Sequence, residues 1–125
     1  MDAKGYHVVF WNPNVRINDH KEMHVTQDEI QWLKDDLETT SLPCVLINHI
    51  PLDNYDDEVH HDKADPTKWV FPSHYEEGSQ IRKVLEDSGK VKLCLAGHRH
   101  FNRYREINGI HYIIHQSLTQ KNSNT

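Results

Sequence analysis

The chain has 125 residues, a formal net charge of -5 with histidine neutral, and 11 histidines. This length fits one domain with a core of its own. The negative charge argues against an extended nucleic-acid surface, because phosphate backbones attract basic proteins. The sequence has no apolar run near the roughly 20 residues that a membrane helix needs, and no signal-peptide pattern opens it. We therefore expect a cytoplasmic protein that binds neither a membrane nor extended nucleic acid.

Apolar and β-branched patterns predict the regular elements. In chain order they are a strand over 6–11, a helix over 27–38, a strand over 44–47, a helix over 76–88, a strand over 91–96, and a hairpin over 101–115 that turns at Asn108-Gly109. A capping box at Thr26 opens the first helix, and we expect Trp32 to widen its apolar face. Gly89 is placed to end the second helix. The residues from 12 to 24 show no periodic pattern.

The alternation of strands and helices predicts an α/β fold with parallel βαβ units and right-handed crossovers. Parallel strands carry their ligand sites beyond their carboxyl ends. His49 follows the strand at 44–47, while His98 and His100 follow the strand at 91–96. Imidazole is the commonest metal ligand, so the three histidines predict a metal site. The alternative for each is a hydrogen bond to the backbone or a place at the surface.

Two cysteines lie inside predicted strands, Cys44 and Cys94. Buried thiols in a reducing compartment explain this placement better than a disulfide framework does.

The long polar segment over 52–75 is a candidate for selectivity, because loops of this length in compact domains are often functional. Its His60 and His61, set among acidic residues, fit a solvated loop better than a second metal contact. Its aromatic residues could stack on a nucleotide base or pack the segment onto the core, and packing is favoured. They are Trp69, Phe71 and Tyr75.

Other polar residues near these motifs have ordinary explanations. Asn48 either orients His49 or forms a turn, and Arg99 either meets a phosphate or is solvated at the surface. The remaining strand and loop histidines are interpreted as structural: His7, His24, His111 and His115. The charged residues of the hairpin are interpreted as an ordinary charged strand face: Arg103, Arg105 and Glu106.

The chain carries two motifs in this order: Asn48-His49-Ile50-Pro51 and Gly97-His98-Arg99-His100. With the helix at 31–37 and the closing hairpin from Tyr104 to Ile114, they resemble the C-terminal half of a calcineurin-like metallophosphoesterase. The resemblance covers nearly the whole chain. It implies that residues 1–125 are the C-terminal part of a four-layer α-β-β-α sandwich domain. It also implies that His49 and His98 bind one metal of a dinuclear pair and His100 the other.

The family's earlier D-x-H, G-D-x-x-D and G-N-H motifs have no counterpart in this sequence. Those motifs would supply the bridging aspartate and the remaining ligands, so no catalytic or substrate-binding residue is assigned in this chain. The resemblance implies two divalent ions (Mn, Fe or Zn) in the complete domain, and we expect fewer or none in this chain alone. We therefore expect a fragment that is incomplete as an enzyme.

The function that this resemblance implies is phosphoester hydrolysis at a dinuclear divalent-metal centre, with a phosphoester substrate such as a nucleotide. Phosphodiesterase and phosphomonoesterase activity are both compatible with the sequence. The alternative is a non-catalytic metal-binding or interaction module. Either way, a half-fold would leave a sheet edge exposed, and such an edge favours self-association.

Overall fold

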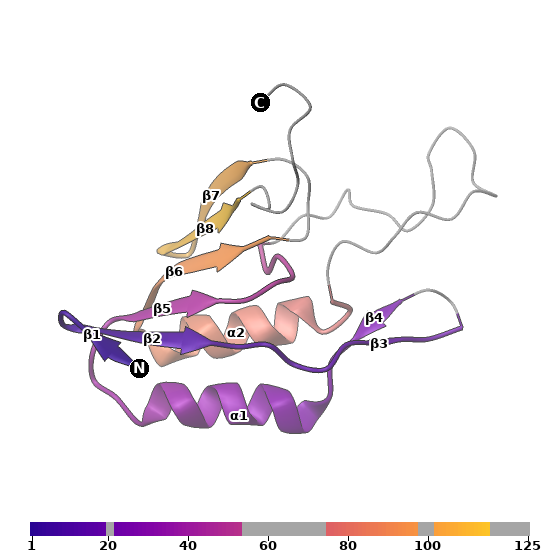
Figure 1. Ribbon diagram of the computed structural model, residues 1–125, viewed down its shortest axis with the longest axis horizontal. Coiled ribbons are helices and arrows are strands. Elements are labelled where there is room, and N and C mark those ends of the chain that lie inside the picture. The colour runs from indigo at the N-terminus through magenta and orange to yellow at the C-terminus, as the bar shows by residue number, and fades with distance from the viewer. Residues whose placement is uncertain (20–21, 54–74, 98–101, 116–125) are drawn as a thin grey trace.

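The computed structural model describes residues 1–19, 22–53, 75–97 and 102–115, which form a mixed α/β fold (Figure 1). Its central sheet has six strands in the order β1-β2-β5-β6-β8-β7. These strands are β1 (Asp2–Ala3), β2 (Tyr6–Phe10), β5 (Cys44–Ile47), β6 (Val91–Ala96), β7 (Arg103–Ile107) and β8 (Ile110–Ile114). A second, two-stranded sheet consists of β3 (Arg16–Ile17) and β4 (Met23–His24), and the two helices are α1 (Gln27–Glu38) and α2 (Gly78–Ser88).

The middle of the central sheet is parallel. Strand β2 pairs with β5, β5 with β6, and β6 with β8, all in the parallel sense. Strands β1 and β7 run antiparallel at the two edges of the sheet. The predicted parallel βαβ arrangement is therefore confirmed, and the carboxyl ends of β2, β5, β6 and β8 meet at one edge, which we call the carboxyl edge.

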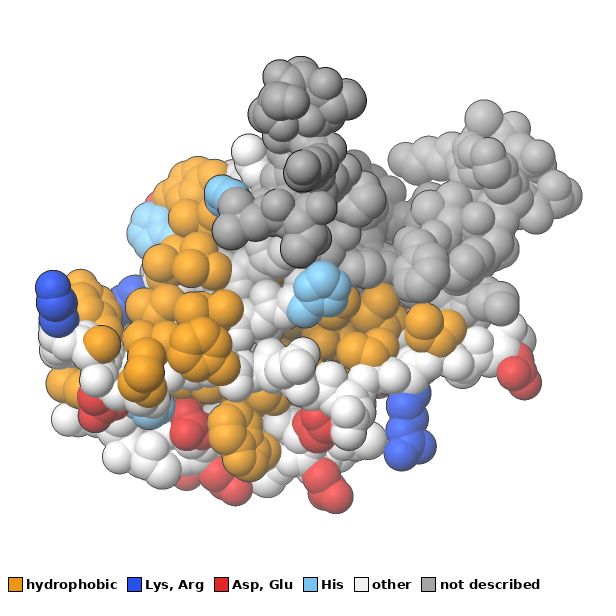
Figure 2. Space-filling view, viewed as in Figure 1, with side chains coloured by type: hydrophobic (Ala, Val, Ile, Leu, Met, Phe, Trp, Pro, Cys, Tyr) orange, Lys and Arg blue, Asp and Glu red, His pale blue; other side chains and the backbone are white. Residues whose placement is uncertain are grey.

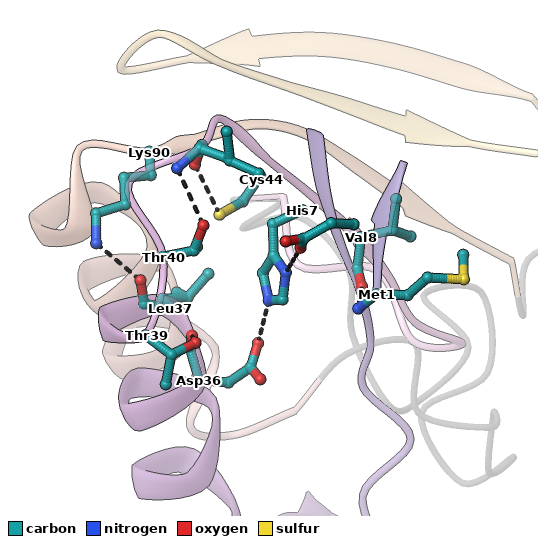
Figure 3. A network of polar contacts seen from close by, with 11 residues as sticks. Met1, His7, Val8, Asp36, Leu37, Thr39, Thr40, Cys44 and Lys90 are labelled. Atoms are coloured by element: carbon teal, nitrogen blue, oxygen red, sulfur yellow. Dashed lines mark hydrogen bonds and ion pairs between the residues drawn. The ribbon is translucent and has the colours of Figure 1, made fainter. Parts of the chain in front are cut away.

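Both helices begin and end close to the residues that the sequence indicates. The Thr26 side chain accepts a hydrogen bond from the Glu29 backbone N–H at 3.3 Å, so α1 begins with the predicted cap. Helix α2 begins at Gly78 rather than at residue 76, and it ends at Gly89, whose φ of 68° is left-handed. Lys90 Nζ donates to the Leu37 carbonyl at 2.8 Å, which places a cation at the carboxyl end of α1 (Figure 3).

The hydrophobic core lies between the helix pair and one face of the central sheet. The two helices pack against each other and α2 also contacts β6. Leu33 and Leu37 of α1 and Ile81 and Leu85 of α2 are almost fully buried. They meet alternate residues of the strands, since side chains along a strand point to opposite faces. The strand residues of this core include Val9, Cys44, Leu46, Cys94 and Tyr112.

The opposite face of the sheet is also apolar. The strand registers place one residue from each of five strands in a line across the sheet. In the order of the strands β2, β5, β6, β8 and β7, these residues are Phe10, Ile47, Leu95, Ile113 and Tyr104. We call these five residues the apolar row. In the part of the chain that the structure describes, neither helix covers this face, and its outer members Phe10 and Tyr104 are 60% and 58% exposed. Figure 2 shows hydrophobic side chains gathered at the left, where Figure 1 draws β2, β5, β6 and β8.

One sequence-based expectation about the fold was wrong, and two short features were not predicted. Trp32 does not widen the apolar face of α1, because it is 52% exposed. The residues between 12 and 24 include the short β3–β4 ribbon, and residues 2–3 form an additional edge strand. Two-residue strands carry too little periodic pattern to stand out in a sequence.

Candidate functional site

His49 lies at the carboxyl edge, directly after β5 and Asn48. His49 is exposed, whereas Asn48 before it and Ile50 after it are buried. The Asn48 side-chain amide donates to the Ile50 carbonyl and so closes a turn around His49. Asn48 therefore has the turn-forming role that the sequence left open, and this turn presents His49 outward.

Gly97 approaches His49 from the end of the neighbouring strand β6. The Gly97 backbone N–H donates to the His49 carbonyl at 3.0 Å. A Cβ atom at Gly97 would lie 3.8 Å from Nδ1 of His49, so the two residues are in close contact. The ends of β5 and β6 therefore meet, with Gly97 beside the imidazole of His49.

Of the three predicted ligands, only His49 falls within the described residues. His98 and His100 lie outside them, as do Arg99, His60, His61, Trp69 and Phe71. Within the described ranges, no group of three or more histidine, cysteine or acidic side chains could hold a metal ion. The described part of the site therefore contributes one imidazole, and an exposed imidazole is a suitable ligand for a divalent transition metal.

An acidic residue close to His49 in sequence, Asp53, is held by an arginine. Asp53 is 4% exposed, and both of its carboxylate oxygens accept hydrogen bonds from Arg103, at 3.0 Å from Nε and 3.0 Å from Nη2. Arg105 Nη1 lies 3.9 Å from the same carboxylate. The interpretation of Arg103 as part of an ordinary charged strand face was wrong, because its guanidinium is buried in this ion pair.

The interior below the carboxyl edge holds two polar groups on core strands. The Cys94 thiol lies 3.6 Å from the side-chain oxygen of Asn48, and burial raises the pKa of this thiol. Cys44 and Cys94 are both buried and unpaired as thiols, as the sequence predicts. The Tyr112 hydroxyl is also buried and has no hydrogen-bond partner among the described residues. Burial raises the pKa of this hydroxyl.

The histidines interpreted as structural do have structural contacts. His7 lies between Asp2 and Asp36, with Nδ1 2.6 Å from the first carboxylate and Nε2 2.8 Å from the second (Figure 3). These hydrogen bonds, that of Asp36 first, raise the pKa of His7. The Glu77 carboxylate, 2.6 Å from Nδ1 of His24, likewise raises the pKa of His24.

At the hairpin, Nδ1 of His111 lies 2.6 Å from the Tyr104 hydroxyl. His115 follows β8 at the carboxyl edge, where its backbone N–H donates to the Ala96 carbonyl at 2.9 Å. His115 is an exposed residue, so a fourth histidine lies at the edge where the sequence indicated three.

Nothing in the sequence singles out the Asp53–Arg103 pair. Asp53 is one of several acidic residues in a polar segment, and Arg103 is one of several charges in the hairpin. Tyr75 is the exception among the aromatic candidates of the 52–75 segment, since it is buried and its ring makes an edge contact with Trp11. Packing onto the core, rather than stacking on a ligand, is therefore confirmed for Tyr75.

Within the described residues, neither helix has the length and apolar character needed to cross a membrane.

The chain was compared with known proteins. No family model matches the sequence. No curated protein matches it either. Among solved structures, the fold is similar to that of a dimetal phosphatase from Danio rerio, with a TM-score of 0.55 and 18% sequence identity over 74% of this chain. The chain spans 27% of the length of that phosphatase. The similarity shows that the mixed α/β arrangement, with its parallel sheet and two helices, occurs as part of a phosphatase fold.

Proposed function

We propose that this chain forms the C-terminal part of a metallophosphoesterase domain and hydrolyses phosphoesters at a dinuclear divalent-metal centre together with sequence that it lacks. The observation that carries the proposal is the junction of β5 and β6 at the carboxyl edge. There the Gly97 N–H donates to the His49 carbonyl at 3.0 Å. His49 lies at this junction, and His98 and His100 follow Gly97 directly in the sequence. The similarity in fold to a dimetal phosphatase supports the same function.

In this proposal the chain supplies imidazole ligands, with His49 and His98 for one metal and His100 for the other. A metal pair bound there would polarise the phosphoester and supply a hydroxide for in-line attack. Three neutral imidazoles bring no negative charge to hold two divalent ions close together. Asp53 does not provide that charge, since Arg103 occupies both of its carboxylate oxygens. We propose that sequence outside this chain supplies the carboxylates, as the family resemblance implies.

The exposed face of the sheet supports the four-layer α-β-β-α sandwich as the complete architecture. The apolar row crosses five strands on the face that the described helices leave open. In a sandwich, a second sheet packs on such a face about 10 Å away. The match covers 27% of the phosphatase chain, so a complete domain has ample sequence elsewhere to form that sheet.

The substrate that we propose is a phosphomonoester or phosphodiester, such as a nucleotide, selected by the 52–75 segment. The buried thiols Cys44 and Cys94 are compatible with the reducing cytoplasm that we propose as its location.

The direct test is metal binding by the purified chain. Mn²⁺ or Zn²⁺ would be titrated by calorimetry into the native chain, into His49→Ala, and into a His98→Ala/His100→Ala variant. The matched control is His111→Ala, because His111 contacts Tyr104 in the hairpin and lies away from the carboxyl edge. Because the chain alone is expected to hold fewer than two ions, we expect at most one weakly bound ion in the native chain and the control, and its loss in the other two. Equal binding in all four proteins would overturn the proposal.

Hydrolysis of an activated bis-aryl phosphate separates the enzyme from a non-catalytic metal-binding module. We expect no turnover by the chain alone, and turnover when it is joined to sequence that carries the missing carboxylate motifs. Metal binding without turnover in that joined protein would favour the module. Turnover by the chain alone that His98→Ala/His100→Ala abolishes would show that no outside carboxylate is needed.

A further inference from the structure

We propose that Asp53 and Arg103 form a clamp that positions His49 for metal binding. The inference rests on the proposed function, because it assigns the clamp a role at the same site. It makes Asp53 a positioning residue and not a ligand. Four observations on the described residues support it: the burial of the segment after His49, the contacts that hold this segment, the geometry of the ion pair, and its place in the sheet.

The segment from Ile50 to Asp53 is buried although it belongs to no helix or strand. Ile50, Leu52 and Asp53 are 2%, 2% and 4% exposed. A loop usually runs over the surface, because its backbone polar groups need partners. Burial of this segment beside the candidate ligand therefore requires specific contacts that replace water.

Those contacts come from three different elements. The Asn48 side chain at the end of β5 donates to the Ile50 carbonyl. Arg82 Nη1 of α2 donates to the Leu52 carbonyl at 3.2 Å. Arg103 of β7 binds the Asp53 carboxylate. The first two contacts bind single carbonyl oxygens, whereas the third joins two opposite charges through two hydrogen bonds.

The ion pair has the geometry that fixes both distance and direction. The two donor nitrogens of Arg103, Nε and Nη2, each lie 3.0 Å from a different oxygen of Asp53. Nη2 also lies 2.8 Å from Oδ2, the oxygen that Nε binds, so two nitrogens of the guanidinium hold the carboxylate at both of its oxygens. The side chains are 15% and 2% exposed, so water competes little for these hydrogen bonds.

The clamp joins the two parts of the chain that carry the candidate ligands. Asp53 follows His49 by four residues, and Arg103 follows His100 by three. Strand β7 is separated from β5 by β6 and β8 in the sheet. The ion pair therefore ties the turn after β5 to the far side of the carboxyl edge. Loss of the pair would let the His49 turn move relative to Gly97, which its carbonyl now contacts.

The test compares Asp53→Asn and Arg103→Lys with the native chain. Asp53→Asn removes the charge, and Arg103→Lys keeps the charge but loses the two-pronged geometry. The matched control is Asp87→Asn, which removes an ion pair with Lys83 at 3.1 Å on the exposed surface of α2. Each protein would be titrated with Mn²⁺ alone, at a temperature where circular dichroism shows it to be folded.

We expect the Mn²⁺ affinity to fall about 10- to 100-fold in Asp53→Asn, the range for residues that orient metal ligands, and to fall also in Arg103→Lys. Asp87→Asn should bind as the native chain does. A purely structural pair would change the unfolding midpoint and leave the Mn²⁺ affinity of the folded protein unchanged, and that result would overturn the clamp. Native affinity in Arg103→Lys would also overturn it, since charge alone would then suffice.

A second measurement keeps this inference separate from the proposed function. Hydrogen exchange of the Gly97 amide reports its bond to the His49 carbonyl without any metal. We expect faster exchange in Asp53→Asn than in Asp87→Asn. If His49→Ala leaves the Mn²⁺ affinity of the chain unchanged but this difference appears, the proposed function fails while the positioning of the His49 turn stands. Equal exchange in both variants would overturn the positioning itself.

Discussion

At the scale of single residues, the buried imidazole of His7 contacts two carboxylates at once. It is 8% exposed and lies between the carboxylates of Asp2 on β1 and Asp36 on α1 (Figure 3). A protonated imidazole donates from both ring nitrogens, so it can satisfy both carboxylates at once. A neutral imidazole has only one donor and leaves the other carboxylate facing a lone pair. His7 therefore links an edge strand and a helix to the sheet through its protonation.

The first prediction is a pH dependence of stability that His7 causes. Hydrogen bonds to Asp36 and then Asp2 raise the pKa of His7 above its ordinary value of 6.5. The contribution to stability is therefore fully present below about pH 6.5, and it is lost as the pH rises through the higher pKa of the folded state. We expect urea unfolding to show a smaller difference in free energy between pH 5.5 and pH 8.5 in His7→Gln than in the native chain.

Two further variants give this prediction its controls. Asp36→Asn removes the carboxylate with the largest effect and should also reduce the difference. Asp35→Asn should not, because the Asp35 carboxylate accepts a hydrogen bond from Gln31 and does not contact His7. An unchanged pH difference in His7→Gln would assign the dependence to other groups, of which His24 beside Glu77 is the first candidate.

At the scale of elements, α1 shows how burial separates two adjacent apolar residues. Leu33 is fully buried against the sheet, while Trp32 is 52% exposed and borders a surface hollow with Phe10 and Asp28. Consecutive residues of a helix point about 100° apart, so one stripe cannot bury both equally. The sequence marks both positions as apolar, and only the packing decides between them.

The second prediction is a large difference in stability between these neighbours. Leu33→Ala should lower the free energy of unfolding by about 2–5 kcal/mol, because it removes buried methyl groups and leaves a cavity. Trp32→Ala should lower it by about 0.5 kcal/mol or less, as is usual for surface substitutions. Urea unfolding of the two variants measures both values. Comparable losses would mean that Trp32 packs against part of the chain that is not described.

The hairpin of β7 and β8 is the element whose turn could be predicted residue by residue. Asn108 and Gly109 both have positive φ, at 51° and 82°, as a type I′ turn requires. The start of helix α1 was likewise predictable, since Thr26 caps its first turn. These features depend on residues close in sequence. The ribbon of β3 and β4 was not predictable, because its strands have two residues each.

The third prediction concerns Gly109. A Cβ atom there would meet nothing within 4 Å, so the cost of Gly109→Ala comes from the backbone conformation alone. We expect a loss of about 1–2 kcal/mol in the free energy of unfolding. Asn108→Gly should be close to neutral, because it fits the same conformation and loses only one exposed hydrogen bond to Glu86. A loss of only a few tenths in Gly109→Ala would show that the turn can change its type.

At the scale of the whole molecule, the parallel sense of the βαβ strands was predictable and the environment of the site was not. The parallel order of β2, β5 and β6 follows from the alternation of strands and helices. It places His49 at the edge where ligands of parallel sheets bind. The Asp53–Arg103 pair joins residues 50 positions apart, and neither residue stands out among its charged neighbours. Only the folded chain shows that one carboxylate near His49 is held by an arginine.

The exposed face of the central sheet is the feature of the whole molecule with the clearest consequence in solution. The apolar row runs across five strands, and a second row beside it aligns Val8 with Val45 and Val45 with Leu93. Contiguous apolar surface of this kind marks an interface in soluble proteins. In a complete domain we propose a second sheet there, and where that sheet is absent we propose that another copy of the chain packs on this face.

The fourth prediction is that the apolar row drives self-association of the chain. We expect analytical ultracentrifugation to show dimers or larger species for the native chain at micromolar concentration, and mostly monomer for Phe10→Lys. Phe10 is 60% exposed in the single chain, so the substitution should change the free energy of unfolding of the monomer by only about 0.5 kcal/mol. Ile17→Lys is the matched control, because Ile17 is 44% exposed on the β3–β4 ribbon, outside the central sheet. Equal association in both variants would exclude the apolar row as the contact and favour pairing at the strand edges, which depends on backbone hydrogen bonds and not on this side chain.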